Sequence, residues 1–163
     1  PDGGYRQESL FDAKIAPSIA VTAIGECFNY LFDQENDASA LSCVLRRACA
    51  ALPAGGLLLF DVATPDRAGT TGRHFHKGDG WVVLVETATD ASGTTLTRMI
   101  HSFVEQDGLY ERHDETHRLR LIDPDDLREE LQTLGLEVSL STAYGTVPLP
   151  TGCMSFLARK SGG

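Results

Sequence analysis

The stretch SIAVTAIGECFNYL, residues 18–31, decides how the rest of the chain is interpreted. Its apolar first part, residues 18–24, favours a strand buried on both faces. The β-branched residues of that strand are Ile19, Val21 and Ile24. Gly25 and Glu26 end the apolar run, and the glycine lets the backbone turn where a ligand can approach. Because open α/β sheets bind ligands at the carboxyl ends of their strands, we expect the site at residues 25–30.

A second stretch, LPAGGLLLFDVATP at residues 52–65, contains the end of a helix, a turn and an apolar strand. We expect a helix at about 39–52, begun by the capping residues Asn36 and Asp37. One face of that helix is apolar at spacings of three and four, which suits it to cover a sheet. The apolar positions are Leu41, Val44, Leu45, Ala48 and Leu52. The strand follows at 57–62.

The order of strand, GECFNYL, helix and LPAGGLLLFD resembles the middle of class I S-adenosylmethionine-dependent methyltransferases. The usual L-(R/K)-P-G-G turn of that family, before its fifth strand, is matched by LPAGG at residues 52–56 with one inserted alanine. The resemblance covers most of the chain. It implies an α/β fold with a partial doubly wound, Rossmann-like sheet, and S-adenosylmethionine as the cofactor.

The core of this fold is expected in two pieces, residues 1–66 and 121–163. Residues 5–10 suggest a short edge strand, and Asp123-Pro124 begins a helix that Gly135 ends. Strands at 136–144 and 153–160 follow. In the resembling family the last two strands form an antiparallel hairpin.

Residues 67–120 are expected as an insertion on the substrate side. The segment 66–80 is polar and glycine-rich, which predicts an exposed, mobile loop. Three strand-like runs follow at 81–89, 94–106 and 109–122. Asp107-Gly108 between the last two is a type I′ hairpin signal, so the insertion predicts an antiparallel meander.

The glycine-rich cofactor loop of the resembling family has no counterpart here. Asp2-Gly3-Gly4 is too short and lacks a preceding strand and a following helix. The chain starts just before the third strand of the family pattern, so we expect either a piece of a longer enzyme or a natural remnant. An unpaired sheet edge is open to self-association, and a homodimer through that edge is one expectation. A remnant acting as a binding or dimerisation module is therefore the alternative function.

The composition narrows the choice of partner. A net charge of −9 over 163 residues argues against nucleic acid or an anionic membrane and favours a small molecule or a protein. No apolar run reaches the ~20 residues that a membrane-spanning helix needs. The four cysteines lack CxxC spacing, which indicates reduced thiols and a cytoplasmic location. A hydrolase is less favoured, because the sequence has no Gly-x-Ser-x-Gly elbow.

The resemblance places the cofactor against two segments. Glu8, Ser9 and Leu10 resemble the family segment that contacts the adenine, where the alternative is a strand end and loop. The strand end supplies the other cofactor candidates. They are Ile24, Gly25, Glu26 and Phe28. Phe28 as a plain core contact, and Glu26 as a helix cap, are the alternatives.

Substrate contacts are expected from the same edge and from the meander. Asn29 and Tyr30 follow the turn, and Asp61 ends the next strand, where it faces the substrate or forms an Asx-type turn. Asn29 and Glu26 are also catalytic candidates, since both can position a substrate. The meander adds three substrate candidates. They are Trp81, His101 and Tyr110.

Pairing across the Asp107-Gly108 turn puts His113, Glu115 and His117 on one face of the meander. His113 is our candidate general base, needed only if the methyl acceptor carries a proton. A solvated charged face is the favoured alternative. A zinc site lacks ligands of convincing spacing, so no metal is expected. His74 and His76 belong to a lid or to a plain surface, and Cys27 suits a small buried hydrophobe.

Overall fold

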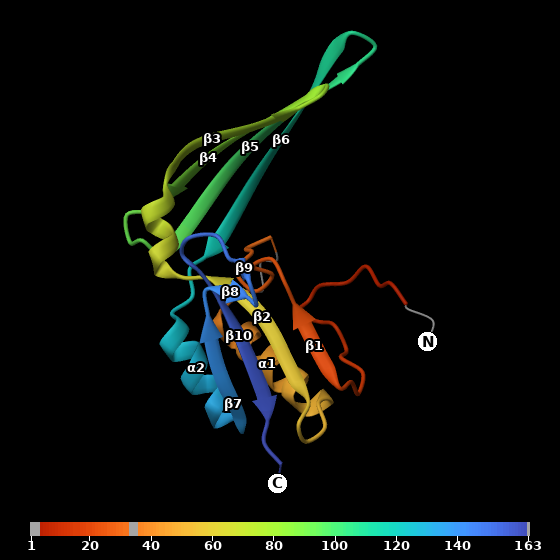
Figure 1. Cartoon of the computed structure of the whole chain (residues 1–163), viewed down its shortest axis with the longest axis vertical. Coiled ribbons are helices and arrows are strands. Elements are labelled where there is room, and N and C mark those ends of the chain that lie inside the picture. Colours follow the sequence, from red (N-terminus) through yellow and green to blue (C-terminus); the bar gives the residue numbers. More distant parts are fainter. Residues whose placement is uncertain (1–3, 33–35, 163) are drawn as a thin grey trace.

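The computed structural model describes residues 4–32 and 36–162, arranged as an α/β core from which an antiparallel sheet projects (Figure 1). The core sheet has the order β1-β2-β10-β7. β1 (Ala20–Ala23) runs parallel to β2 (Leu57–Ala63), whereas β10 (Cys153–Lys160) is antiparallel to β2 and to β7 (Leu136–Ser141). The expected antiparallel pairing of the last two long strands is confirmed.

Helices α1 (Ala38–Ala51) and α2 (Pro124–Thr133) share one hydrophobic core with β2 and β10. All five apolar positions predicted for α1 are buried, and Asp37 caps the helix by accepting a hydrogen bond from the Ala40 amide at 2.8 Å. Asp123 caps α2 in the same way. Phe60 stacks on Phe156 with ring centroids 4.8 Å apart. None of the helices in the described part of the chain is long and apolar enough to cross a membrane.

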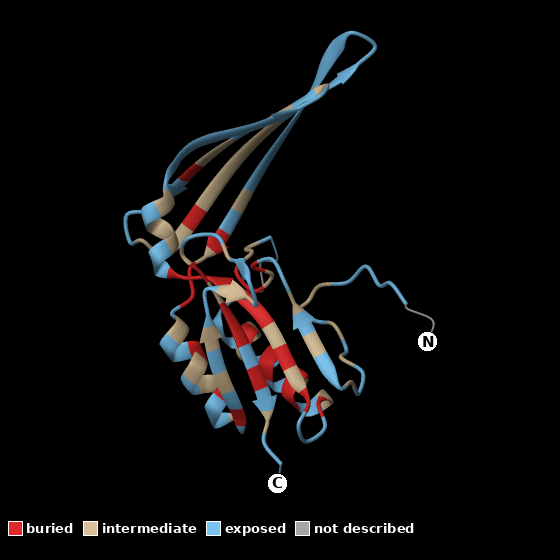
Figure 2. Ribbon diagram, in the orientation of Figure 1, coloured by how far each residue is buried: buried red, intermediate tan, exposed pale blue. Residues whose placement is uncertain are grey.

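β1 differs from its prediction, because it lies at an edge of the described sheet rather than buried on both faces (Figure 2). Ile19 and Ile24, at its two ends, are 84% and 50% exposed. Within residues 4–32 and 36–162 only β2 pairs with it, so its outer side is uncovered. Apolar β-branched residues signal the strand but cannot tell which strand lies beside it.

The projecting sheet has the order β3-β4-β5-β6 and is called the arm below. Its strands are β3 (Gly72–Gly78), β4 (Trp81–Thr89), β5 (Thr95–Gln106) and β6 (Leu109–Arg120). The hairpin at Asp107-Gly108 is confirmed, with φ of 52° and 78°. The shared face predicted for His113, Glu115 and His117 is also confirmed, because these residues oppose Ser102, Ile100 and Arg98 of β5.

The prediction of a mobile loop at 66–80 is wrong. The 3₁₀ helix η1 (Pro65–Thr70) and then β3 occupy it, and β3 pairs along its whole length with β4. Every residue of β3 is exposed, as expected, so the sequence has no apolar alternation to reveal the strand. Only the backbone pairing with β4 gives this segment its strand conformation.

The amino-terminal prediction is also wrong, since residues 5–10 contain no strand. A turn forms instead, in which the Ser9 carbonyl accepts hydrogen bonds from the amides of Asp12 and Ala13. Asp2 and Gly3 of the dismissed glycine motif lie outside the described residues. Between β7 and β10, a small hairpin of β8 (Ala143–Tyr144) and β9 (Val147–Pro148) replaces the predicted extension of the strand to residue 144.

Candidate functional site

Asp61 in β2 stabilises the turn that follows β1, because both lie at the same end of the core sheet. The Asp61 carboxylate accepts the Gly25 amide at 2.7 Å and the Glu26 amide at 2.9 Å. Both turn residues have positive φ, 94° and 59°, which is strained for Glu26. The two charge-assisted hydrogen bonds offset that strain and fix the turn in place.

A third donor completes the shell around Asp61. The Tyr144 hydroxyl donates to Asp61 Oδ1 at 2.8 Å, and burial together with this bond raises the pKa of Tyr144. Asp61 is only 3% exposed. Its carboxylate therefore stabilises the turn from the core side, and the substrate contact expected for Asp61 stays a prediction.

Glu26 joins the core to the arm. Its carboxylate accepts Arg98 Nη2 at 2.8 and 3.1 Å and the Cys153 thiol at 3.1 Å, with Arg67 Nε at 3.6 Å. Glu26 is 8% exposed. Burial and the bond to Glu26 raise the pKa of Cys153 to about 12. Four elements, the turn, β5, η1 and β10, thus meet at one buried carboxylate.

Asn29 is fully buried at the joint between core and arm. Its amide nitrogen donates to the carbonyls of Ala63 at 2.8 Å and Arg120 at 2.7 Å, and its oxygen accepts the Ala63 amide at 3.0 Å. Its amide hydrogens are both engaged, so contact with a substrate would break bonds that hold the fold. These bonds give Asn29 a structural role at the joint, and the catalytic role expected from the sequence stays a prediction.

Tyr30 is brought beside the arm. Its ring stacks on Phe32 with centroids 5.2 Å apart, and the imidazole of His117 meets both rings edge-on at 5.6 and 5.1 Å. His117 also lies 2.8 Å from a Glu115 oxygen. His117, one member of the predicted charged face, therefore packs against Tyr30 of the GECFNYL stretch. The sequence alone did not indicate this contact.

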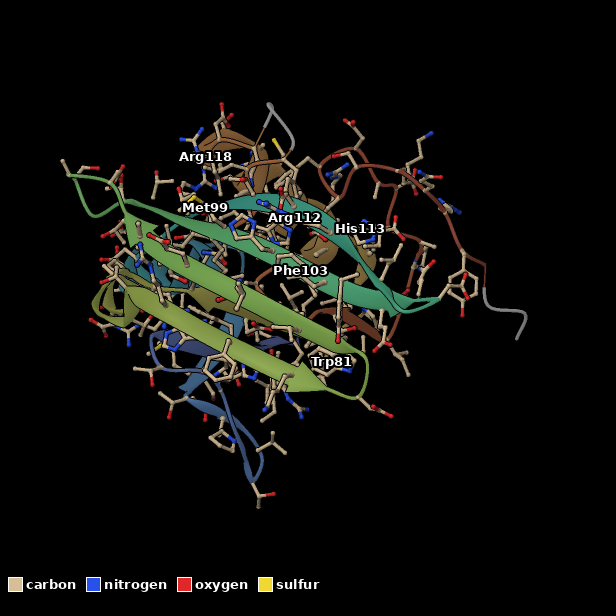
Figure 3. All side chains as sticks on the ribbon, turned by 90° about the horizontal axis from the view of Figure 1, so that it is seen from above. Trp81, Met99, Phe103, Arg112, His113 and Arg118 are labelled. Atoms are coloured by element: carbon tan, nitrogen blue, oxygen red, sulfur yellow. The ribbon has the colours of Figure 1, made fainter. Side chains whose placement is uncertain are left out.

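The remaining arm candidates do not gather around Glu26. His113 lies on the distal part of β6, 3.5 Å from a carboxylate oxygen of Glu111, and Trp81 begins β4 at the same end of the sheet (Figure 3). Tyr110 is next to the distal turn and 59% exposed. His101 points to the opposite face and pairs with Asp114 at 2.6 Å. Among the residues that the structure describes, no contact links these four into one site.

The segment that resembles an adenine contact is fixed against α1. The Arg47 guanidinium donates to the carbonyls of Ala13 at 3.0 Å, Leu10 at 3.5 Å and Phe11. Leu10 and Phe11 also pack against the core, and Glu8 pairs with Arg6 at 3.6 Å. Phe28, 2% exposed, meets Phe60 edge-on and so belongs to the core beneath the turn.

A cavity of about 200 Å³ lies next to the Glu26 cluster and was missed by the sequence interpretation. Its lining comes from η1 and three strands of the arm. The lining residues are Arg67, Thr70, His74, His76, Val85, Thr87 and Arg98. The available signal was the position of Arg67, four residues after the end of β2, but it gains meaning only once β3 is known to be a strand.

Comparison of the sequence with models of protein families and with curated proteins gives no match. Comparison of the fold with solved structures does give matches. One is an S-adenosylmethionine-dependent methyltransferase from Clostridium acetobutylicum, with a TM-score of 0.77 and 17% identity over 95% of this chain and 63% of that one.

Two further matches come from actinobacterial enzymes. The sugar N-methyltransferase KedS8 from Streptoalloteichus has a TM-score of 0.68 and 20% identity, over 96% of this chain and 62% of its own. CalS10, an amino pentose methyltransferase from Micromonospora echinaspora solved with S-adenosylmethionine bound, has a TM-score of 0.72 and 14% identity, over 94% and 63%. The chain thus has the fold of these methyltransferases, as expected, and spans less than two thirds of their length.

Proposed function

We propose that this chain belongs to an S-adenosylmethionine-dependent methyltransferase that acts on a small molecule. One observation carries the proposal: the fold of such methyltransferases extends over at least 94% of the chain, and it includes a preformed turn at the carboxyl end of β1. Strand ends of this kind are where α/β folds bind their ligands.

The residues present suit one side of the cofactor. The Ile24–Glu26 region would border its methionine part, since Asp61 already fixes the turn there. The segment at 8–10 would border the adenine, and Arg47 fixes its end by donating to the Leu10 carbonyl at 3.5 Å. Bound in this way, the cofactor supplies an electrophilic methyl group on a sulfonium. Phe28 supports the turn from the core.

The contribution of the protein to catalysis is then mostly orientation. Methyl transfer is an in-line displacement, so a fixed approach of acceptor to methyl lowers the barrier. We propose that the Glu26–Arg98 pair sets the arm over the turn, and that the arm carries the acceptor. Trp81, His101, Tyr110 and His113 remain proposed outer contacts of a larger acceptor, His113 as a base if the acceptor carries a proton.

A small polar acceptor suits the observations. KedS8 and CalS10 act on a sugar and an amino pentose, and the cavity beside Glu26 is lined almost wholly by polar side chains. The described cysteines are free thiols, which supports the proposed cytoplasmic location.

The alternative is a binding or dimerisation module without transferase activity. The exposed Ile19 and Ile24 along the β1 edge favour it, because an open strand edge with apolar side chains can pair with a second copy. In that case the methyltransferase fold would be retained as a scaffold only.

Calorimetric titration of S-adenosylhomocysteine, with the mass and oligomeric state measured on the same sample, separates the two functions. Binding of one molecule per chain supports the transferase. A tight dimer that releases no heat with S-adenosylhomocysteine contradicts it and supports the module.

A further inference from the structure

The cavity beside Glu26 has a lining in which nearly every side chain can donate a hydrogen bond. Thr70 and Thr87 carry hydroxyls, His74 and His76 carry ring N–H groups, and Arg67 and Arg98 carry guanidiniums. Val85 is the apolar exception, and no lining residue carries a carboxylate.

The arm builds this lining on one face. Gly72, Thr87, Arg98 and His117 oppose one another across the four strands. His74 and Val85 form the next row on the same face, because side chains alternate along each strand. Gly72 contributes no side chain at its place in the first row. A Cβ there would have no neighbour closer than His74 Nε2 at 3.9 Å, so the face is open at this position beside Thr87.

The interactions with Glu26 do not occupy every N–H group of Arg67 and Arg98. Arg98 reaches both Glu26 oxygens through one nitrogen, Nη2. Arg67 Nη1 donates to the Thr151 carbonyl at 2.8 Å, and its buried Nε, 3.6 Å from the nearer Glu26 oxygen, has no hydrogen-bond partner in the described structure. Glu26 and Asp61 are buried behind the lining, and Asp61 is held by three donors. A ligand in the cavity therefore meets donors rather than carboxylates.

The two histidines of the cavity differ from the other three in whether a carboxylate pairs with them. The other three of the five in the chain each lie beside a carboxylate: His101 at 2.6 Å, His113 at 3.5 Å and His117 at 2.8 Å. For His74 and His76 the described residues form no such pair. The two histidines that form no ion pair with a carboxylate in the described part of the chain are thus the two that line the cavity.

We propose that this cavity binds an oxyanion, a carboxylate or phosphate group, of the methyl acceptor. The inference rests on the proposed function, because it takes the arm to carry the acceptor. The anion would take the place that carboxylate side chains hold beside the other histidines. It would also meet the guanidiniums of Arg67 and Arg98 that line the cavity, since guanidiniums match carboxylate and phosphate geometry.

The test needs neither cofactor nor turnover, so its outcome is separate from that of the S-adenosylhomocysteine titration. The ring resonances of all five histidines are followed by NMR while sodium acetate or sodium phosphate is added at constant ionic strength. Acetamide, the neutral counterpart of acetate, is the matched probe. We expect saturable shifts at His74 and His76 with at least one anion, and none with acetamide.

Variants locate the binding. His74→Gln and His76→Gln should each weaken anion binding at least about tenfold, as expected for loss of one hydrogen bond to a charged group. Arg73→Gln, whose side chain lies on the opposite face of the arm and pairs with exposed Glu86, should leave it unchanged. Saturation by acetate alone identifies a carboxylate acceptor, and saturation by phosphate alone a phosphorylated one. Equal shifts with acetamide, shifts that never saturate, or equal shifts at His101 would overturn the proposal.

Discussion

Arg98 Nη2 lies 2.8 Å from one oxygen of Glu26 and 3.1 Å from the other, so a single nitrogen of the arm bridges a carboxylate of the core turn. The two side chains are 16% and 11% exposed. This pair fixes where the arm stands over the end of β1, and several predictions depend on it.

Replacing Glu26 by Gln should lower the free energy of unfolding by about 2–3 kcal/mol, because the charge of a mostly buried Arg98 loses its partner. Urea unfolding measures the change. Arg73→Gln is the matched control, since it breaks an exposed pair with Glu86 and should leave stability within experimental error. Equal losses of stability in both variants would show that the buried Glu26–Arg98 pair contributes no more than the exposed Arg73–Glu86 pair.

Asp61→Asn should destabilise the turn, because one amide oxygen cannot replace two carboxylate oxygens that accept three hydrogen bonds. We expect a loss of about 2 kcal/mol, against about 1 kcal/mol for Tyr144→Phe, which removes one donor only. Chemical denaturation of both variants and of the double variant tests this. Fully additive losses would argue against a shared network around Asp61.

Asn29→Ala should behave as a folding variant. It leaves the Ala63 amide and the carbonyls of Ala63 and Arg120 without their partner, at a cost of about 3 kcal/mol. The loss should appear in thermal unfolding with or without S-adenosylhomocysteine. Unchanged stability together with lost methyl transfer would instead restore the catalytic role that the sequence suggested for Asn29.

Stability should fall at alkaline pH through Cys153. Its pKa rises from 9.0 to about 12 in the folded chain, so the folded state holds the thiol proton more tightly than the unfolded state does. This contribution is complete below about pH 9 and is lost as the pH rises towards 12. Urea unfolding at pH 8 and pH 10.5 should show a smaller decline for Cys153→Ala. An identical decline in both proteins would refute the assignment.

Much of the core could be predicted because its signals are local. The capping Asp37, the apolar face of α1 and the Asp107-Gly108 turn each specify structure through their immediate neighbours, and the register of β5 with β6 follows from that turn. β3 could not be predicted, since its exposed residues lack alternation and its order comes from pairing with β4.

The site was harder to predict than the fold. The turn at Gly25 and Glu26 was correctly expected after β1, but the sequence does not show that Asp61 turns inward or that Asn29 bonds across the joint. Arg98 is 72 positions from Glu26 along the chain, and their contact depends on how the arm stands on the core. Long-range pairing of this kind leaves no local pattern to recognise.

The central claim is that the cofactor lies against the Gly25-Glu26 turn, and backbone amide NMR tests it most directly. On addition of S-adenosylhomocysteine, the largest shifts should occur at the amides of Gly25, Glu26 and Cys27, whereas His113 at the distal part of the arm should not move. Asp61→Asn should reduce the affinity about tenfold. Saturating shifts that leave the turn unchanged, or no shifts at all, would contradict the account.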